Sequence, residues 1–316
     1  MAGPCVPTEA ARRACLLCLI ALAVACAPAA RVPAQEGAVR LPPGFRLETF
    51  ASGLGAPRFM VVRFPYRSGD LTGGKPEVVI RDLPSGGGHW TRTLAFGPDG
   101  KMYVSVGSSC NVCEERDPRR AAILQFNPDG TGGRIFARGI RNAVGIAFHP
   151  QTGELWATDN GRDWLGDDFP PDTILVVKDG AHYGWPSCNG NWVSDPDFGR
   201  PDFCKTTAPP AVEIQAHSAP LGLTFYTGGM FPAEYRGNLF VAFHGSWNRS
   251  VPTGYKVIWI PMQGGTPGRP QEFATGWLQG NYAWGRPVDV ITGKDGALYV
   301  SDDRAGMIYR ISHSTR

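Results

Sequence analysis

The chain has 316 residues, of which 42% are hydrophobic and 19% charged, and its formal net charge is +3. This composition is typical of a globular protein and excludes an intrinsically disordered one. The mild charge and the lack of any run of Lys or Arg exclude nucleic acid as the expected partner.

The N-terminus predicts an export signal. Arg12 and Arg13 precede the apolar run ACLLCLIALAVACAPAA, which has about the length of a signal-peptide core and is short for a bilayer span. The stretch LAVAC, ending at Cys26, is similar to a bacterial lipobox, but Ala23 stands where Leu is usual. We therefore expect export, whereas lipidation of Cys26, the expected route of any membrane attachment, stays open.

Half of the eight cysteines lie beyond this signal. In an oxidising compartment they are more typical of disulfides than of a metal site. The sequence leaves several connectivities open; we favour the local pairs Cys110–Cys113 and Cys188–Cys204, with a zinc tetrad as the alternative. A c-type haem is excluded at CNVCE, because Glu114 rather than His follows the second cysteine.

After about residue 54 the chain repeats one strand–turn–strand pattern. Each copy joins an apolar triplet, a turn rich in Gly, Pro or Asp, and a second strand with Leu or an aromatic residue. The copies lie at residues 93–107, 145–161, 222–245 and 289–303. Further strands are expected between them, at residues 122–127, 173–180, 255–260 and 307–312.

Blade-like repeats of this kind, with a period near about 50 residues, predict an all-β fold of the β-propeller type. We expect six blades; a β-sandwich is the structural alternative. No long helical periodicity occurs beyond the signal. Residues 44–50 should form a terminal strand that closes the ring against the last blade. We expect residues 1–34 to be an export segment with a linker, and residues 35–316 to form a single propeller domain.

Propellers place their sites on the loops at one end of the inner strands. His89 lies in such a loop, and its imidazole can accept a proton from a hydroxyl at neutral pH. Arg141 and Asn142 offer a fixed cation beside an amide, which suits a carboxylate or an oxygen that gains charge. Taken singly, the histidine is better interpreted as a loop residue bonded to a carbonyl, and the arginine as an ion-pair partner between blades.

Two further loops carry weaker signals. Residues 159–168 combine acidic side chains with glycines, an oxygen-rich composition that Ca²⁺ prefers, although the spacing is not that of an EF-hand. A solvated acidic turn is the alternative there. Arg286, before the last inner strand, and His244 are weak indications by themselves.

Taken in this order, these segments resemble the soluble quinoprotein sugar dehydrogenases, the glucose and sorbosone dehydrogenase family of six-bladed propellers that use pyrroloquinoline quinone (PQQ). The resemblance covers nearly the whole mature chain. Its most specific parts are GGHWTRTLAFGPDGKMYVSVG, RGIRNAVGIAFHP, YGWP and GRPVDVITGKDGALYVSDD. The segment SSCNVCEERDPRRAAI and the loop between Cys188 and Cys204 are most similar to the sorbosone dehydrogenase-like branch.

The resemblance implies roles for three of these residues. His89 stands at the family's general-base position, where it takes the proton of a sugar hydroxyl as hydride passes to the quinone. Arg141 matches the arginine that polarises the reacting quinone carbonyl, and Asn142 matches the cofactor-binding residue beside it. The substrate would be an aldose or a sorbosone-type sugar, and the electrons would leave to an external acceptor, a quinone or a cytochrome.

The same resemblance implies a metal and an anion site. Gly161 and Arg162 match the positions whose backbone carbonyls hold the Ca²⁺ that is bound to PQQ, and Asn160 lies at the adjacent polar position. Arg286 matches the first of two arginines that contact PQQ carboxylates. A trianionic cofactor requires such cations, and Ca²⁺ would act on the quinone as a Lewis acid.

The sequence departs from the family pattern in three places. The second cofactor arginine would fall at Val288, and the family's cofactor lysine has no clear match, with Arg249 or His244 as its candidate replacements. Between residues 56–62 and 63–70, about two strands of the first blade are absent, which would leave an inner strand poorly covered with unpaired edges. Either neighbouring segments rebuild this blade, or the chain is a damaged version that folds poorly.

Two other functions remain open from the sequence. A calcium-dependent propeller hydrolase of the lactonase kind would share the acidic loop and a histidine base, without needing two arginines aimed at an anionic cofactor. A non-catalytic propeller that binds a carbohydrate or a protein is the second alternative. Export places either of them, like the dehydrogenase, in the periplasm or, with a lipid anchor, on the periplasmic or outer surface of a bacterial membrane.

Overall fold

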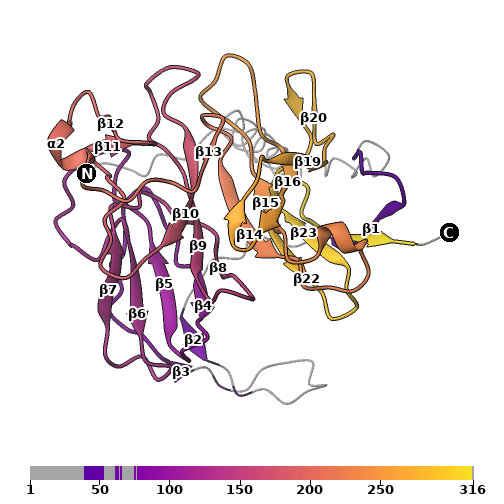
Figure 1. Cartoon of the computed structure of the whole chain (residues 1–316), viewed down its shortest axis with the longest axis horizontal. Helices are drawn as coiled ribbons and strands as arrows, with labels where there is room; N and C mark the ends of the chain where they lie inside the picture. Colours follow the sequence, from indigo (N-terminus) through magenta and orange to yellow (C-terminus); the bar gives the residue numbers. More distant parts are fainter. Residues whose placement is uncertain (1–38, 53–60, 64, 66–74, 76, 315–316) are drawn as a thin grey trace, which may run out of the picture. The chain divides into compact units, whose positions relative to one another are not determined.

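Four antiparallel sheets of four strands each form most of the chain that the computed structural model describes, which comprises residues 39–52, 61–63, 65, 75 and 77–314 (Figure 1). The export segment and Cys26 lie outside these residues. The first sheet contains β4 (Leu94–Phe96), β5 (Met102–Val106), β6 (Ala122–Phe126) and β7 (Arg134–Arg138). The second contains β8 (Ile146–Phe148), β9 (Leu155–Asp159), β10 (Asp172–Val177) and β13 (Val212–Ile214).

The other two sheets repeat this order, in which strands adjacent in the sequence pair as neighbours. The third contains β14 (Pro220–Phe225), β15 (Leu239–Phe243), β16 (Lys256–Ile260) and β19 (Gln271–Ala274). The fourth contains β22 (Pro287–Thr292), β23 (Leu298–Asp302), β24 (Met307–His313) and β1 (Phe45–Ser52). All four hairpins predicted from the repeated pattern are therefore present, as β4–β5, β8–β9, β14–β15 and β22–β23.

Local chemistry explains why two of these hairpins turn where they do. In the turn between β4 and β5, Asp99 accepts hydrogen bonds from the Lys101 backbone at 3.0 Å and from the Tyr103 hydroxyl at 3.0 Å. In the turn between β22 and β23, Asp295 accepts the hydroxyl proton of Tyr299 at 3.1 Å. An aspartate bonded to its own turn stabilises the bend, and the tyrosine four residues later ties that bend to the second strand.

Apolar side chains join each sheet to the next. Tyr103, Ile123, Leu155 and Leu175 pack between the first and second sheets. Trp156, Ile174, Leu223 and Val241 pack between the second and third, and Phe240, Val257, Val300 and Tyr309 pack between the third and fourth. Along the same series the inner strand β14 contacts β8 on one side and β22 on the other. This is the face-to-face packing of successive blades, and it confirms the β-propeller fold.

Strand β1 supplies the fourth strand of the last sheet. It pairs antiparallel with β24, from Phe45 opposite His313 to Ser52 opposite Met307, with an irregularity between Thr49 and Ala51. The prediction that residues 44–50 form a strand against the last blade is therefore confirmed.

The region of the shortened first blade forms a small sheet, in which β2 (Val62–Arg63) pairs with β3 (Glu77–Val78). The segment after β3 rebuilds part of the cover of the next sheet, because a cluster of Ile80 with Met102, Val104 and Leu124 also contacts Val61 and Leu83. The inner strand β4 keeps exposed apolar residues, Leu94 at 39% and Phe96 at 59%. The count of six blades stays a prediction, since the described residues form four complete blades and this partial one.

The segment between β10 and β13 carries the pair β11 (Cys188–Asn189) and β12 (Val193–Ser194) and the four-residue helix α2 (Pro201–Cys204). A disulfide between Cys188 and Cys204 closes this segment, and a second joins Cys110 to Cys113. Both predicted local pairs are confirmed, and the zinc-tetrad alternative was wrong because all four sulfur atoms are bonded in pairs.

Two further two-residue pairs and a short 3-10 helix complete the described elements. They are β17 (Met262–Gln263) with β18 (Thr266–Pro267), β20 (Leu278–Gln279) with β21 (Tyr282–Ala283), and η2 (Ala233–Tyr235). Within the described part of the chain, no helix has the length and apolarity that a membrane crossing requires.

Candidate functional site

One cavity of about 290 Å³ brings together most of the residues predicted from the sequence. They come from loops at the ends of inner hairpins: before β4, before β8, after β9 and before β22. The predicted residues that line the cavity are His89, Arg141, Asn142, Asn160, Gly161 and Arg286, together with the weaker candidate His244 after β15. The volume is close to the lower limit of typical small-molecule sites, about 300–1,000 Å³.

His89 is placed by the pairing of its loop with the segment that follows β5. The backbone N–H of Gly88 donates to Ser109 O at 2.7 Å, and that of His89 donates to Ser108 O at 3.2 Å. Gly87 has a φ of +85°, and a Cβ atom there would lie 2.7 Å from the Ser109 Cα. Gly87 is therefore needed for close backbone contact between these two segments, whereas a Cβ atom at Gly86 would meet nothing within 4 Å.

The His89 imidazole is neutral at neutral pH. Burial, which is the larger cause, and the positive charge of Arg141 together lower its pKa from 6.5 to about 4. Its Nδ1 atom lies 2.7 Å from the Ser108 hydroxyl oxygen. A neutral imidazole on the wall of a cavity can act as a proton acceptor, provided that its other nitrogen is unprotonated.

Arg141 is buried and held by several acceptors. Its Nε donates to Asn111 O at 2.8 Å, one Nη donates to Asn111 Oδ1 at 2.8 Å and to Asp163 Oδ2 at 3.2 Å, and the other donates to Asn160 O at 3.1 Å. Arg141 thus forms an ion pair with Asp163 and also lines the cavity. Its two interpretations from the sequence, as an ion-pair partner and as a site residue, are therefore compatible.

A half-buried carboxyl organises the backbone of these residues. Asp159, at the end of β9, accepts the Arg141 N–H at 3.2 Å and the Asn142 N–H at 2.6 Å. Burial raises the pKa of Asp159 to about 7. The hydrogen bonds act in the opposite direction, because they stabilise the carboxylate and so lower the pKa. The equivalent carboxyl of the last blade, Asp302 at the end of β23, accepts the Arg286 N–H at 2.9 Å.

The structure separates the two expected calcium positions. Gly161 lines the cavity, and its N–H donates to Asp172 Oδ1 at 2.9 Å. The Arg162 side chain points to another set of partners, donating to Asp195 and Asp197 at 2.9 Å each, and does not line the cavity. At Arg162, only the backbone carbonyl can therefore serve as a Ca²⁺ ligand. This is the atom that the family resemblance implied.

Arg286 keeps a positive charge next to the cavity. Its guanidinium donates to His244 O at 3.0 Å and Gly245 O at 2.6 Å and lies 5.3 Å from the centre of the Tyr255 ring. In the part of the chain that the structure describes, no carboxylate forms an ion pair with it. Its guanidinium is bonded to carbonyls and an aromatic ring, and the Asp303 carboxylate interacts with it electrostatically without a direct ion pair, so it can still contact an anionic ligand.

Of the two candidates for the missing lysine, only His244 lines the cavity. Its Nε2 lies 3.0 Å from Asp303 Oδ1. The structure does not bring Arg249 into the cavity. The Arg249 side chain instead bonds to Asp167 O and pairs with Asp168 at 3.1 Å, because these carboxyl and carbonyl groups of the acidic loop lie within its reach.

Sequence reasoning missed several residues of the cavity wall, among them Asp172, His217, Trp247 and Asn248, and it named the loop of Asp163 but not that residue. His217 lies just before β14, and Trp247 and Asn248 follow β15, so the rule that selected the other loops could have found them. The Asn248 amide donates to Asp163 Oδ1 at 3.0 Å, while its own Oδ1 is buried and has no partner among the described residues. A buried acceptor without a partner suits a ligand that brings a donor or a cation.

The fold and the cavity together define the class of the protein: a β-propeller whose loops gather cations and histidines at the ends of its inner hairpins. The family described as TrAA12-like matches residues 50–314, and the chain belongs to this family.

Two curated relatives show how far the similarity extends. An uncharacterized protein of Borreliella burgdorferi is 40% identical over 216 residues, covering 67% of this chain and 57% of that protein. The pyrroloquinoline quinone-dependent pyranose dehydrogenase of Coprinopsis cinerea is 27% identical over 292 residues, covering 71% of this chain and 39% of that protein. The chain therefore spans well under two thirds of the length of each.

Solved structures agree on the fold. The holo form of the Coprinopsis cinerea pyranose dehydrogenase PQQ domain matches with a TM-score of 0.72 and 20% identity, covering 87% of this chain and 97% of that one. The calcium structure of a Trichoderma reesei family AA12 protein matches with a TM-score of 0.70 and 18% identity, covering 90% and 100%. The family resemblance expected from the sequence is confirmed, whereas the sorbosone branch stays a prediction.

Proposed function

We propose that the chain is a PQQ-dependent sugar dehydrogenase, which oxidises an aldose or a sorbosone-type sugar and passes the electrons to an external acceptor, a quinone or a cytochrome. The observation that carries the proposal is the presence of His89, Arg141 and Arg286 on the wall of one cavity. The relatives named as PQQ-dependent support it, within the part of their length that this chain spans.

The residues present fit such a cofactor. Two guanidinium groups, those of Arg141 and Arg286, line the cavity and suit an anionic quinone. The backbone oxygens of Gly161 and Arg162 accept no hydrogen bond from any described residue, which leaves them available to Ca²⁺. When bound, PQQ would supply a two-electron acceptor and Ca²⁺ a Lewis acid.

The chain's own residues would then have distinct tasks. His89, neutral at neutral pH, accepts the proton of the substrate hydroxyl through Nε2. Arg141, fixed by Asn111 and Asp163, stabilises negative charge that develops on an oxygen in the cavity. Arg286 binds a carboxylate in the same cavity.

Two exposed indoles support a sugar as the substrate. Trp247 lines the cavity and is 62% exposed, and its ring packs edge-to-face on that of Trp164 with the ring centres 5.0 Å apart. Large, rigid aromatic faces beside a polar cavity suit the alternating apolar and hydroxyl surfaces of a pyranose.

The two disulfides support export of the protein, because such bonds persist in oxidising compartments. We therefore place the protein in the periplasm or, with a lipid on Cys26, on the periplasmic or outer surface of a bacterial membrane. Mass spectrometry of the mature N-terminus tests this, since a lipidated chain would begin at a diacylated Cys26.

Reconstitution tests the proposed activity. Purified protein is incubated with PQQ and Ca²⁺ and assayed for dye reduction with several aldoses; we expect dye reduction that requires the quinone. Lactone hydrolysis without PQQ uptake would favour a calcium-dependent lactonase-type hydrolase instead. Neither activity, with retained carbohydrate or protein binding, would favour a non-catalytic propeller.

His89→Ala tests the base. Because a positioned base contributes about 10²–10⁴-fold, turnover should fall at least about 10²-fold while PQQ uptake is mostly retained. His149→Ala, in the turn between β8 and β9, is the control and should keep its turnover. Unchanged turnover in His89→Ala would refute the assignment of His89 as the base.

A further inference from the structure

We infer that the segment Ser108–Glu115, closed by the Cys110–Cys113 disulfide and called here the disulfide loop, is the element that positions both His89 and Arg141. The sequence indicates no function for this segment beyond a cross-link. In the structure it makes the hydrogen bonds that orient the imidazole and the guanidinium of the cavity. The consequence for turnover rests on the proposed function, whereas the orientation of the two side chains does not.

The first contact selects the tautomer of His89. The Ser108 hydroxyl donates its single proton to Cys110 O at 2.7 Å. The same oxygen lies 2.7 Å from His89 Nδ1, so it accepts a hydrogen bond there and Nδ1 carries the proton. In a neutral imidazole this leaves Nε2 unprotonated, which is the state that a proton acceptor requires.

The second contact orients Arg141. The Asn111 carbonyl accepts from Arg141 Nε at 2.8 Å, and the Asn111 side-chain oxygen accepts from an Arg141 Nη at 2.8 Å. The side-chain oxygen also accepts the Asp163 N–H at 2.8 Å, and the Asn111 amide donates to Asp163 O at 3.2 Å. One asparagine between the two cysteines thus binds the arginine together with the acidic loop that pairs with it.

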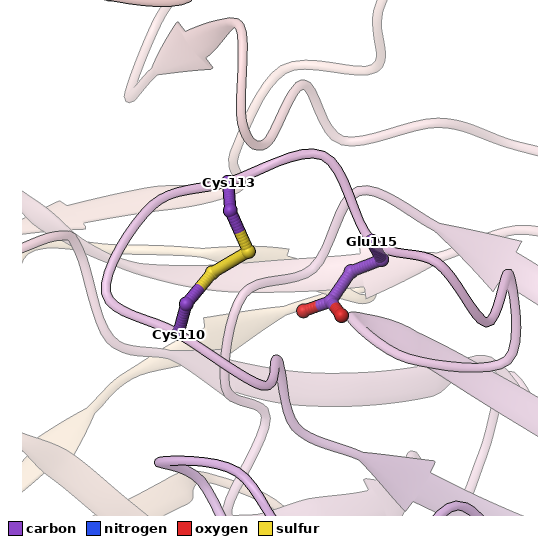
Figure 2. A group of neighbouring side chains, drawn as sticks. All are labelled: Cys110, Cys113 and Glu115. Carbon is purple, nitrogen blue, oxygen red and sulfur yellow. A yellow bond between two sulfur atoms is a disulfide. The ribbon is translucent and has the colours of Figure 1, made fainter.

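The covalent link and a carboxylate define the path of the loop (Figure 2). Cys110 and Cys113 are joined three residues apart, and Glu115 accepts the Ser109 backbone N–H at 2.5 Å and the Ser109 hydroxyl at 2.7 Å. The ligand atoms of Cys110, Cys113 and Glu115 lie within 4.8 Å of one another, but the sulfur atoms are bonded to each other and the carboxylate is bonded to Ser109. The disulfide and the hydrogen bonds of Glu115 therefore hold the backbone carbonyls of residues 110 and 111 in position.

The first experiment removes the hydroxyl contact. Ser108→Ala deletes the acceptor of His89 Nδ1–H at a residue that is 0% exposed. Ser105→Ala is a matched control, because Ser105 lies on β5 of the same sheet, is also 0% exposed and contacts no atom of His89 in the hydrogen-bond network. ¹⁵N NMR of histidine-labelled apoprotein identifies the tautomer, and His89→Gln assigns the signal among the six histidines.

We expect the wild type and Ser105→Ala to show protonated Nδ1 and unprotonated Nε2 at His89. Ser108→Ala should show an increased population with protonated Nε2, as in a free imidazole. In the reconstituted enzyme, Ser108→Ala should lower kcat about tenfold or more, part of the roughly 10²–10⁴-fold that a positioned base contributes, and Ser105→Ala should stay within about twofold. Protonated Nε2 in the wild type, or an unchanged tautomer in Ser108→Ala, would overturn the inference.

The second experiment removes the link itself. The double variant Cys110→Ala/Cys113→Ala should change the His89 tautomer and speed the exchange of the Arg141 Nε proton, with the latter assigned by Arg141→Lys. The control is Cys188→Ala/Cys204→Ala, whose cysteines are separated by 16 residues instead of three. Because the longer loop restricts the unfolded chain more, this control should lower Tm more and yet leave both NMR signals unchanged.

The control should lose more Tm, whereas only Cys110→Ala/Cys113→Ala should change the NMR signals. This opposite order separates an effect on side-chain position from an effect on general stability. A merely structural disulfide loop would give NMR changes that follow Tm, and that result would contradict the inference. Since the NMR signals are measured without cofactor, absence of dye reduction would refute the proposed function alone. Unchanged His89 and Arg141 signals in Cys110→Ala/Cys113→Ala would refute the inference alone.

Discussion

His89 and Arg141 form a coupled pair within the site. Burial is the main cause that lowers the pKa of His89 to about 4, and the Arg141 charge is the second. The arginine stays buried because Asn111, Asn160 and Asp163 satisfy its donors. As a result the imidazole is neutral across the pH range in which a free histidine would titrate.

The first prediction concerns this pair. Replacing Arg141 by Gln removes a positive charge, so the pKa of His89 should rise from about 4 toward 6.5, as followed by NMR titration of the apoprotein. Arg134→Gln, which removes an exposed ion pair with Asp179, is the control and should leave that pKa unchanged. An unchanged His89 pKa in Arg141→Gln would show that burial alone sets it.

The sign of the effect on stability follows from the same shift. Between pH 4 and 6.5 the unfolded chain binds a proton at His89 that the folded chain does not. His89 therefore lowers the free energy of unfolding as the pH falls through this window, and His89→Gln should make the acid side of the stability profile less steep. Chemical denaturation at several pH values measures this.

At the scale of elements, neighbouring blades approach each other closely where their inner strands begin. The Thr158 hydroxyl of β9 accepts the Gly145 N–H at 2.9 Å and donates to Leu221 O of β14 at 2.7 Å, which joins the second sheet to the third. A Cβ atom at Gly145 would lie 2.3 Å from Leu221 O and 2.9 Å from Leu223 N. Both are backbone atoms, so the contact cannot relax by a side-chain rotation.

The second prediction follows from this contact. Gly145→Ala should lower the free energy of unfolding by about 1–3 kcal/mol, the usual cost of overpacking, in urea denaturation. Gly229→Ala, where a Cβ atom would meet nothing within 4 Å, should change it by less than about 0.5 kcal/mol. Equal effects of the two substitutions would contradict the close approach of β8 and β14.

At the scale of the whole molecule, the last sheet is completed by residues from the other end of the described chain. Phe45 of β1 packs edge-to-face against Phe231, Tyr235 and Phe273, with ring centres 4.5–5.4 Å apart. These rings belong to the segment after β14 and to β19, so β1 contacts the third sheet as well as its own. One strand thus links the N-terminal segment to two blades.

The third prediction tests this link. Phe45→Ala should lower the free energy of unfolding by about 3 kcal/mol, at the lower end for a buried phenylalanine because Phe45 is only partly buried. Phe96→Ala on β4, where the ring is 59% exposed, should cost less than about 0.5 kcal/mol. A small effect at Phe45 would show that β1 contributes little to the stability of the propeller.

The sequence alone was sufficient to predict the features that depend on residues close together in the chain. The hairpins were predictable because the turn aspartates Asp99 and Asp295 bond within a few residues of themselves, and the local disulfides because export makes nearby cysteines pair. The order of the site loops was also evident, since each one is adjacent to a recognisable inner strand. Fold, disulfides and the loops of the site therefore followed from short-range patterns.

Only the tertiary structure decided which side chains of those loops share the cavity. Arg141 and Arg249 were both plausible cofactor ligands, but Arg249 bonds to the acidic loop, and its direction depends on partners about 80 residues away in sequence. The disulfide loop looked like a mere cross-link until Ser108 and Asn111 were seen to contact His89 and Arg141. Side-chain direction is set by long-range packing and hydrogen bonding, which a local pattern does not encode.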